Sequence, residues 1–390
     1  MHLTVITTPE EFAALGPSWG RLQQRCSRNC VFLTHEWFDA AWQWRQRDAC
    51  MHMLCCWEDD ELVGVLPMVC GTAPRAGREC AFLAVPDTQI CDLIAADEHV
   101  DAVAAAFADE LSRCIPEWDV LRLRYLPATS TAATAFAAAL AARGFPYRAN
   151  QATINPVVAL DDSWDAYYAT RSRRLKKSSN LIANRLAKAG EIVIEWLEPG
   201  YGTNVEVDRA IDVITGISAS SWKKETGNSL ENPGPQAFIR RLSRHARERG
   251  WLSIWTLRVD GRPLAMEYQL IVDGNVHALR SDFNAVCAQI SPGSHLSRHL
   301  LQQLFGRGLN RYFMGPGNNA YKYRWTERAE PVWEMFVYSR SLRGRMLALW
   351  ELTLRPFARR VRDRVRRLWR VTSDPGETRA FEQDDEGRAS

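Results

Sequence analysis

The sequence predicts an α/β (α+β) protein made of two halves, each a mixed, mainly antiparallel sheet flanked by helices. Some segments carry apolar residues at helical spacing and others carry short apolar runs, and the two kinds alternate along the chain. The chain has 390 residues, of which 46% are hydrophobic and 24% charged, as in ordinary globular proteins. At roughly 150 residues per domain, this length corresponds to two or three domains. A disordered chain and a small disulfide-framed protein are therefore excluded.

The first half combines helices with a hairpin. Residues 32–44 have apolar side chains at helical spacing, and Thr34 is placed to cap that helix. Two apolar runs, 51–57 and 62–69, surround the acidic turn 58–60 and predict a hairpin. A further strand is expected at Val120–Tyr125. It is flanked by two alanine-rich helices, Val100–Cys114 and Thr131–Ala142.

The second half contains a clearer strand pattern. A long polar helix is expected over 163–188, ended by Gly190, as a bridge from the first half. Three strands then form an antiparallel meander with Asp-Gly turns that suit type I′ geometry, at Leu252–Val259, Leu264–Val272 and Val276–Asp282. A helix is expected over 295–308.

The basic charge is concentrated near the C-terminus. Residues 340–370 contain eleven arginines against Glu351 and Asp363, whereas residues 371–390 carry six acids against two arginines. Apolar residues recur among the arginines at helical intervals, so an amphipathic basic helix is expected, interrupted near Pro356. This helix suits an anionic membrane surface; docking on its own domain or on a partner is the alternative.

These patterns divide the chain into five parts. A first domain covers 1–155 and is followed by a bridging helix over 156–195. A second domain, which carries the donor site, covers 196–340. The basic helix covers 341–370, and a disordered acidic tail covers 371–390.

The cysteines favour neither zinc nor disulfides. The ten cysteines include no CxxC pair, and Cys26, Cys30 and His35 are the nearest approach to a ligand cluster. Buried, reduced cysteines are expected, and no metal. Residues 1–10 lack a basic segment followed by an apolar run, and no stretch approaches the roughly 20 apolar residues of a membrane span. A cytoplasmic location is expected, with the basic helix allowing peripheral attachment to the inner face of the membrane.

A Ser-Pro-Gly-Ser segment at 291–294 stands between the meander and the following helix. The first N–H groups of a helix and the positive end of its dipole favour phosphate, so a pyrophosphate-bearing cofactor such as coenzyme A would suit this position. An ordinary capping turn is the alternative interpretation.

The order of the segments resembles the GNAT superfamily, specifically CelD-type tandem GNAT-like proteins of cellulose and exopolysaccharide biosynthesis, whose second half is similar to Fem-type aminoacyl transferases. The resemblance runs from about Val31 to Val337. It rests on short motifs in order: FLTHEW at 32–37, Leu66-Pro67, Arg173 to Leu186, SWK at 221–223, GRPLA at 261–265, Asp282, SPG at 291–293, Leu296, Gly308, GPG at 315–317 and YKYRW at 321–325.

The resemblance implies one active site, in the second half, with the first half helping to form a substrate cleft. It implies that the loop and helix after the central strand hold the donor pyrophosphate, which corresponds here to Gln289, Ser291, Pro292, Gly293, Ser294 and His295. The common family loop has glycine at the position of Pro292, so the donor stays open between acyl-CoA, which is favoured, and the aminoacyl-tRNA of Fem-type enzymes.

Acyl transfer to an amine needs a proton acceptor and a proton for the leaving thiolate. Glu267 and Asp282 lie on the meander and are the candidate acceptors, each with a structural ion pair as its alternative role. Tyr321 is the candidate donor to the thiolate, and Lys322 would hold a phosphate or a substrate carboxylate. Buried packing is the alternative role of Tyr321, and a surface ion pair is the alternative role of Lys322.

Trp222 and Lys223 are expected to line the acceptor cleft. The sequence thus predicts an acyl-CoA-dependent N-acyltransferase acting on an amine or amino-sugar acceptor, in exopolysaccharide, cellulose or cell-envelope biosynthesis by resemblance. A Fem-type transferase that uses charged tRNA and a non-catalytic membrane-peripheral accessory protein are the alternatives. The basic run 171–177 is expected to be a solvated helix face, and nucleic acid other than tRNA is not expected.

Overall fold

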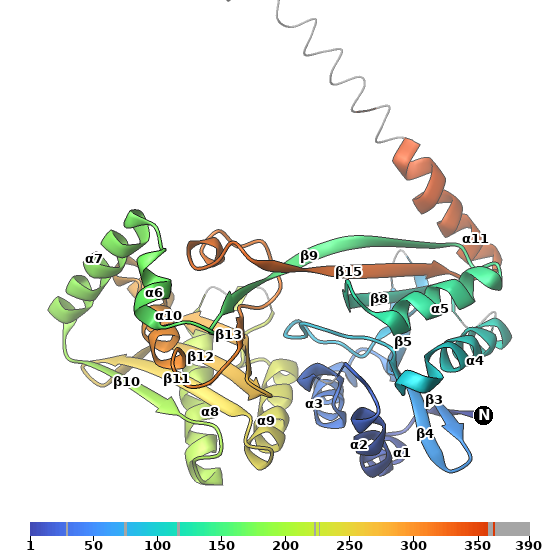
Figure 1. Ribbon diagram of the computed structural model, residues 1–390, viewed down its shortest axis with the longest axis horizontal. Coiled ribbons are helices and arrows are strands. Elements are labelled where there is room, and N and C mark those ends of the chain that lie inside the picture. Colours follow the sequence, from blue (N-terminus) through green and yellow to red (C-terminus); the bar gives the residue numbers. More distant parts are fainter. Residues whose placement is uncertain are drawn as a thin grey trace, which may run out of the picture.

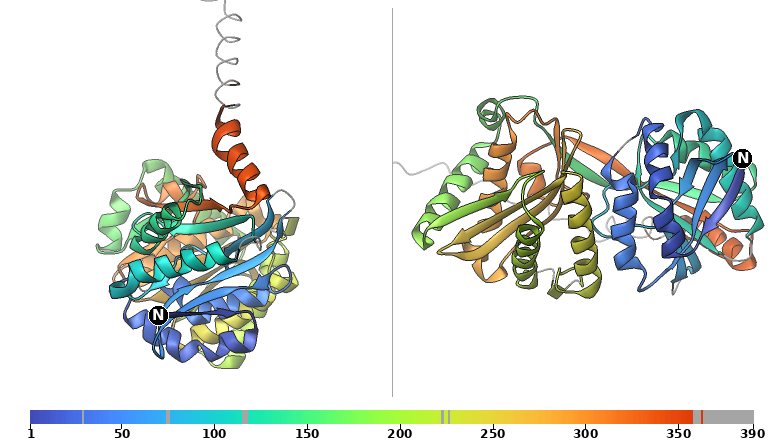
Figure 2. Two further views of the ribbon diagram at one scale, coloured as in Figure 1. Left: turned by 90° about the vertical axis from the view of Figure 1, so that its right-hand side faces the viewer. Right: turned by 90° about the horizontal axis from the view of Figure 1, so that it is seen from below.

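A computed structural model describes residues 1–28, 30–73, 76–114, 118–221, 224–225, 227–357 and 362. Two halves lie side by side and are joined by two long strands, β9 (Tyr147–Ala159) and β15 (Ala329–Tyr338) (Figures 1 and 2). Most strands form one eleven-stranded sheet, in the order β10-β11-β12-β13-β14-β9-β15-β8-β6-β5-β2, and a second sheet has the order β1-β3-β4-β7. Helices flank mixed, mainly antiparallel sheets, as the sequence predicts.

The first half contains the hairpin and alanine-rich helices expected from the sequence. Thr34 caps its helix by accepting a hydrogen bond from the Trp37 N–H at 3.1 Å. The elements are β1 (His2–Ile6), α1 (Pro9–Ala14), α2 (Gly16–Gln24), α3 (His35–Arg45), β2 (Cys50–Met51), β3 (Met53–Glu58), β4 (Glu61–Leu66), β5 (Met68–Ala73), β6 (Gly77–Phe82), β7 (Ile94–Ala95), α4 (Val100–Arg113), β8 (Val120–Pro127) and α5 (Thr131–Ala142).

The second half is built on the meander. Both turns have two consecutive residues with positive φ, Asp260 (47°) with Gly261 (75°) and Asp273 (48°) with Gly274 (72°), as a type I′ turn requires. Helices α8 and α9 pack on one face of the meander, and α7 and α10 on the other. The elements are α6 (Trp164–Ala169), α7 (Arg173–Ala189), β10 (Ile192–Leu197), α8 (Asn204–Ala219), α9 (Pro233–Glu248), β11 (Leu252–Val259), β12 (Arg262–Val272), β13 (Asn275–Phe283), α10 (Pro292–Leu304) and β14 (Arg311–Phe313).

The long strands β9 and β15 belong to both halves. Strand β9 pairs with β15 along 147–156 and with β14 along 157–159, while β15 also pairs with β8 of the first half. Thirteen residues of strand span ~43 Å, which is long enough to cross from one half to the other. The predicted division at 155/156 therefore falls inside β9, and the part 196–340 supplies β15 to the sheet of the first half.

The expected bridge over 163–188 is two helices rather than one. Helix α6 ends at Ala169, and α7 begins after Ser172, whose side chain accepts a hydrogen bond from the Leu175 N–H. A serine in extended conformation at this position caps a new helix and ends the old one. Gly190 ends α7 with a φ of 148°.

Two helix boundaries also differ from the sequence-based prediction. Helix α10 begins at Pro292, not at His295, because proline fits the first turn of a helix and Ser291 turns the chain with a φ of 52°. Helix α11 (Leu342–Leu349) continues through the π-helical η6 (Trp350–Leu354) and past Pro356 to 357. The wider π turn accommodates the proline that was expected to interrupt the helix. Of the rest of the predicted basic helix only residue 362 is described, and the acidic tail 371–390 lies outside the described residues.

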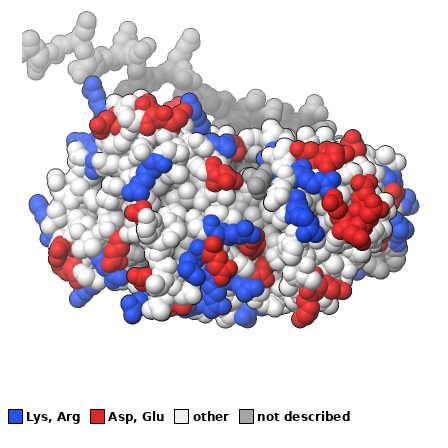
Figure 3. Space-filling view, turned by 60° about the horizontal axis from the view of Figure 1, so that its bottom comes forward, with Lys and Arg blue, Asp and Glu red and all other residues white. Residues whose placement is uncertain are grey.

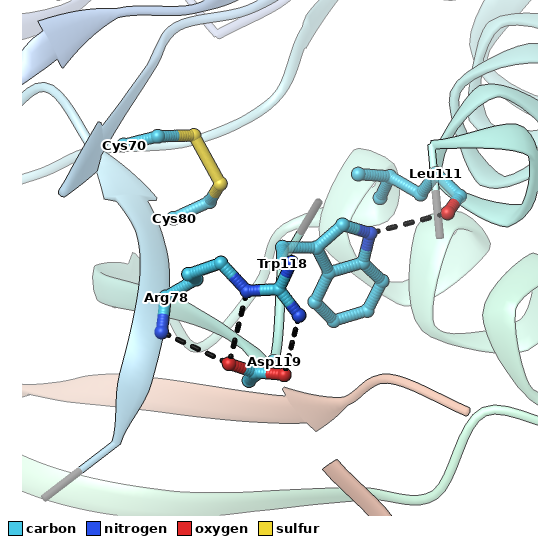
Figure 4. The surroundings of a disulfide bond; sticks show 6 residues. All are labelled: Cys70, Arg78, Cys80, Leu111, Trp118 and Asp119. Carbon is cyan, nitrogen blue, oxygen red and sulfur yellow. Dashed lines mark hydrogen bonds and ion pairs between the residues drawn. A yellow bond between two sulfur atoms is a disulfide. The ribbon is translucent and has the colours of Figure 1, made fainter. Parts of the chain in front are cut away.

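The expectation of reduced cysteines is wrong for one pair. Cys70 on β5 and Cys80 on β6 are directly opposite each other across two antiparallel strands and form a disulfide (Figure 4). The side chains of such cross-strand partners point to the same face, which brings the two sulfur atoms together. Beside the disulfide, Arg78 and Asp119 form an ion pair at 3.0 Å.

One hydrophobic core cluster spans the two halves, and a second cluster lies within the second half, between the meander and helices α7 and α10. Trp37 on α3 packs edge-on against Phe238 on α9, with ring centroids 5.4 Å apart. The same core cluster contains residues of β3, β4, α4, α8, α9 and β12. On the surface drawn in Figure 3, basic and acidic side chains are interspersed. This mixture agrees with the near-neutral charge of residues 1–339, which carry 36 basic and 38 acidic residues.

Candidate active site

The central sheet of the second half opens between β13 and β14. These two parallel strands pair at three positions, from Asn275 with Arg311 to His277 with Phe313. Strand β14 then ends, whereas β13 continues to Phe283. The next β13 carbonyl, that of Ala278, accepts a hydrogen bond from the Gln89 Nε2 of the first half at 2.8 Å. The strands therefore part beyond His277, and polar side chains from several elements meet at this opening.

Glu267 is a buried carboxylate at the opening. It lies on β12, and its Oε1 accepts hydrogen bonds from the Tyr312 hydroxyl at 2.5 Å and from the Gln269 Nε2 at 2.7 Å. Burial raises the pKa of Glu267, although these hydrogen bonds and the charge of Lys322 act in the opposite direction. A carboxylate with a raised pKa accepts a proton more readily than an ordinary one.

Lys322 lies beside Glu267 in a short helical turn (Lys322–Arg324). Its side chain is buried, and its Nζ donates to the carbonyl oxygens of Gly315 at 2.6 Å and Pro316 at 3.3 Å. The ammonium group therefore fixes the chain segment after β14 and places a positive charge near the Glu267 carboxylate.

Tyr321 and Asp282 complete the group. Tyr321 is 45% exposed, and desolvation of its hydroxyl together with the charges of Glu267 and Asp282 raises its pKa to about 12. The hydroxyl thus keeps its proton at neutral pH. Asp282 is buried on β13, opposite Met266, so strand alternation directs it to the other face of the meander from Glu267, which is opposite Ser281.

The structure therefore brings together the predicted residues Glu267, Asp282, Tyr321 and Lys322, whose roles stay predictions. It also adds Tyr312, Gln269 and Gln89, which sequence reasoning missed. Gln269 could have been noticed as a polar residue inside an apolar strand, whereas nothing in the sequence around Gln89 indicates that it reaches β13. The predicted acceptor residues Trp222 and Lys223 lie outside the described residues.

The predicted donor loop forms the start of α10. Pro292 has no N–H, and the N–H groups of Ser294 and His295 donate to the Ser291 carbonyl oxygen at 3.2 and 3.3 Å. Ser294 is exposed and Gly293 is half-buried. The first turn thus offers an anion fewer backbone N–H donors than the sequence predicts, because the N–H groups of Ser294 and His295 already donate to Ser291.

Other features of this loop fit a phosphate-bearing donor. The buried His295 Nδ1 has no hydrogen-bond partner among the described residues, and burial lowers the pKa of His295, so its ring is neutral at neutral pH. Arg185 on α7 reaches the Gln289 carbonyl oxygen at 3.5 Å and so places a guanidinium beside the loop. The loop thus combines a buried imidazole nitrogen without a partner among the described residues and a nearby positive charge for an anion.

A cavity of about 550 Å³ lies between the two halves. Its lining includes Gln89, Tyr125, Asn155, His277, Arg311 and Phe313. Gln89 Oε1 accepts from the Asn155 Nδ2 at 3.1 Å, and burial lowers the pKa of His277 to about 3. A side chain at Gly315 would lie 3.8 Å from Gln89 Nε2 and 3.9 Å from Lys322 Nζ. Gly315 therefore lies between Gln89 of the cavity lining and Lys322.

Asp92, a buried carboxyl near this cavity, predicts a pH effect on stability. Burial raises its pKa from 3.8 to about 7, although Ser130 and Arg28 lower it in part. The folded protein binds this proton more tightly than the unfolded chain, so the contribution to stability is complete below pH 4 and is lost as the pH rises through about 7. We expect Asp92→Asn to raise the unfolding free energy at pH 8 by a few kcal/mol at most, at about 1.4 kcal/mol per pH unit, and to change it little at pH 4.

Denaturant unfolding at pH 4 and pH 8 measures this effect, with Asp48→Asn, a substitution at an exposed carboxylate, as the control. Equal stability changes at both pH values would contradict a raised pKa at Asp92.

Comparison with known proteins agrees with this geometry. Residues 173–323 match the family model of the acetyltransferase (GNAT) domain. That range runs from α7 to Tyr323 and contains the donor loop, Glu267, Asp282, Tyr321 and Lys322. No curated protein matches the chain.

Three solved structures share the fold over nearly their whole length. The C-terminal domain (DUF2156) of a candidate lysylphosphatidylglycerol synthetase from Agrobacterium fabrum is 13% identical, with a TM-score of 0.55 over 88% of this chain and 96% of that one. A conserved protein of unknown function from Bacteroides thetaiotaomicron is 11% identical, with a TM-score of 0.51 over 87% and 100%. FemX is 11% identical, with a TM-score of 0.50 over 90% and 100%. The predicted GNAT-like fold is confirmed, and the CelD-type relationship stays a prediction.

Among the described residues, no group of three or more His, Cys, Asp and Glu side chains is arranged to hold a metal ion. Of the helices in the described ranges, none has the length and apolar character needed to cross a membrane.

Proposed function

We propose that this protein is an N-acyltransferase that moves an acyl group from acyl-CoA to an amine or amino-sugar acceptor. The observation that carries the proposal is the end of the pairing between β13 and β14, beside which the Glu267 carboxylate accepts a hydrogen bond from Tyr312 of β14 and lies close enough to Tyr321 for its charge to raise the pKa of that hydroxyl. By resemblance to CelD-type proteins, the acceptor belongs to exopolysaccharide, cellulose or cell-envelope biosynthesis, and the protein works in the cytoplasm.

The reaction needs the opening to carry out two proton movements. The acceptor nitrogen attacks the thioester carbonyl carbon, so that a C–N bond forms and the C–S bond breaks, and one proton passes from nitrogen to sulfur overall. In this proposal Glu267 takes the proton from the amine, directly or through one water, and its raised pKa suits it to that step. Tyr321, which keeps its proton at neutral pH, donates a hydrogen bond to the leaving sulfur.

The two substrates would approach from different sides. The donor phosphates would lie at Ser291–His295 and beside Arg185, and the acyl end would extend to the opening. The acceptor would occupy the cavity between the halves, whose lining of amide, imidazole and guanidinium groups suits a hydroxyl-rich or amino-sugar molecule. Lys322 would position the chain segment that separates the two substrates.

Calorimetric titration of the full chain with acetyl-CoA, a long-chain acyl-CoA and free CoA tests the donor. Saturable binding of any of them supports the proposal, and release of free thiol in the presence of a panel of amines and amino sugars would then identify the acceptor. If none of the three ligands binds, the acyl-CoA proposal is wrong.

The basic charge of helix α7 favours an alternative kind of donor. Helix α7 contains six basic residues and no acidic residue, and its exposed side chains include Arg173, Arg174, Lys177 and Lys188. This basic face continues to Arg185 beside the donor loop, so a polyanionic donor such as aminoacyl-tRNA would contact both.

The tRNA alternative predicts salt-dependent binding of charged tRNA that Arg173→Ala/Lys177→Ala weakens at least tenfold, with a smaller dependence on salt. If this variant binds tRNA as the unchanged protein does, and acyl-CoA binds saturably, the tRNA alternative is wrong and acyl-CoA is the donor.

A further inference from the structure

The C-terminal helix exposes a row of large apolar side chains on one side. Helix α11 and η6 extend away from the body, beyond the end of β15 (Figure 1). Six apolar residues in this segment are between 45% and 78% exposed: Leu342, Met346, Leu349, Trp350, Leu354 and Phe357. They make up six of the fifteen exposed large hydrophobic residues in the described chain, and they fall within sixteen consecutive positions. Exposed apolar patches of this kind mark interaction sites.

The opposite side of the helix holds it on the protein. Gly344 and Ala348, one turn apart, are buried against the end of β15 and β8. A side chain at Gly344 would lie 2.4 Å from the Ser339 carbonyl oxygen, so only glycine permits this close approach. The Ser341 hydroxyl, which caps the helix, donates to Asp119 Oδ1 at 2.9 Å. The apolar row is therefore presented outward by a helix whose other side is already packed.

Basic side chains border the apolar row. Arg343 and Arg345 are exposed on the same turn as Met346. The single acid of this segment, Glu351, is paired with Arg355 at 2.6 Å and with Arg148 at 3.4 Å. Along the sequence, the arginines continue, so that residues 340–370 carry a net charge of +9. Apolar side chains flanked by exposed arginines match a surface with anionic head groups over an apolar interior.

We infer that residues 342–357 form an interfacial helix that attaches the protein to an anionic lipid surface. The side chains of Leu342, Met346, Leu349, Trp350 and Phe357 enter the boundary between head groups and acyl chains, and Arg343 and Arg345 contact the lipid phosphates. Because Gly344 and Ala348 fix the helix to the end of β8 and β15, the lipid surface lies beside the first half.

Flotation of the full chain with vesicles tests the inference. We expect binding to vesicles that contain phosphatidylglycerol, weak binding to vesicles of phosphatidylcholine alone, and a decrease as salt increases. Met346→Ser/Leu349→Ser/Phe357→Ser leaves the charge unchanged and should reduce binding at least tenfold. The matched control is Tyr201→Ser/Val205→Ser, which removes two equally exposed apolar side chains from the second half and should bind as the unchanged protein does.

Two other outcomes would overturn the inference. Equal binding by the triple variant would show that charge alone attaches the protein. If the unchanged protein does not bind vesicles but sediments as a dimer that the triple variant converts to a monomer, the apolar row is an interface between two copies of the chain. Either result is independent of the donor titration, because none of these residues lies at the opening of the sheet.

Discussion

Replacing Glu267 by glutamine should lower kcat by about 10²–10³-fold while the protein stays folded. The glutamine oxygen can still accept the hydrogen bonds from Tyr312 and Gln269, so the local structure has no unpaired donor. The substitution removes a carboxylate that burial makes unfavourable in its charged form, so stability at neutral pH should not fall. What is lost is the group that accepts the amine proton.

The pH profile separates a catalytic role from a structural one. Only the ionised carboxylate accepts a proton, and burial raises the pKa of Glu267 above 4.5. Activity of the unchanged enzyme should therefore fall as the pH decreases towards that raised pKa, and the residual activity of Glu267→Gln should lack this acidic limb. The control is Glu195→Gln on β10, which removes an exposed carboxylate of the same sheet and should leave kcat unchanged.

Asp282→Asn provides the contrasting result. Asp282 is also buried at the opening but is directed to the other face of the meander. If Asp282→Asn abolishes activity and the acidic limb while Glu267→Gln retains both, the proton acceptor is Asp282 and the assignment to Glu267 is wrong.

Local patterns in the sequence predicted the three strands of the meander and the helix after them, whereas β10, α8, α9 and β14 were not predicted. The Asp-Gly pairs at 260–261 and 273–274 fix both turns of the meander, because positive φ at two consecutive residues is a local property. The same is true of the Thr34 cap. The break between α6 and α7 was missed because Ser172 is one of several serines in a polar segment, and only its extended conformation makes it a cap.

Long-range pairings could not be predicted in the same way. The exchange of β9 and β15 between the halves depends on which edge each sheet leaves open, and a single strand gives no indication of its partner. The Gln89 side chain reaches Ala278 across 189 positions of the chain, and the Cys70–Cys80 disulfide depends on the register of β5 with β6. Glu267 and Asp282 were found because a carboxylate on the meander can accept the amine proton, whereas Tyr312 was missed because a tyrosine in a strand is ordinary.

Replacing Gly293 by aspartate should weaken donor binding at least 100-fold if the first turn of α10 holds the donor phosphates. The new carboxylate would lie on the first helical turn, where the negative charge repels a phosphate but interacts favourably with the helix dipole. The fold should therefore be retained, with a stability change within about 1 kcal/mol. The added Cβ would lie 3.3 Å from the Phe283 ring, so a small shift of that ring is expected as well.

Gly293→Ala separates charge from this steric effect. It introduces the same Cβ without a carboxylate, and donor affinity should stay within about threefold of the unchanged protein, because the loss of affinity comes from repulsion between like charges. Gly216→Asp, in a part of α8 where an added Cβ meets no atom within 4 Å, controls for an extra negative charge on a helix elsewhere and should bind donor normally. Equal affinity for CoA in Gly293→Asp and the unchanged protein would place the donor phosphates away from α10, and the basic face of α7 would then be the position to test.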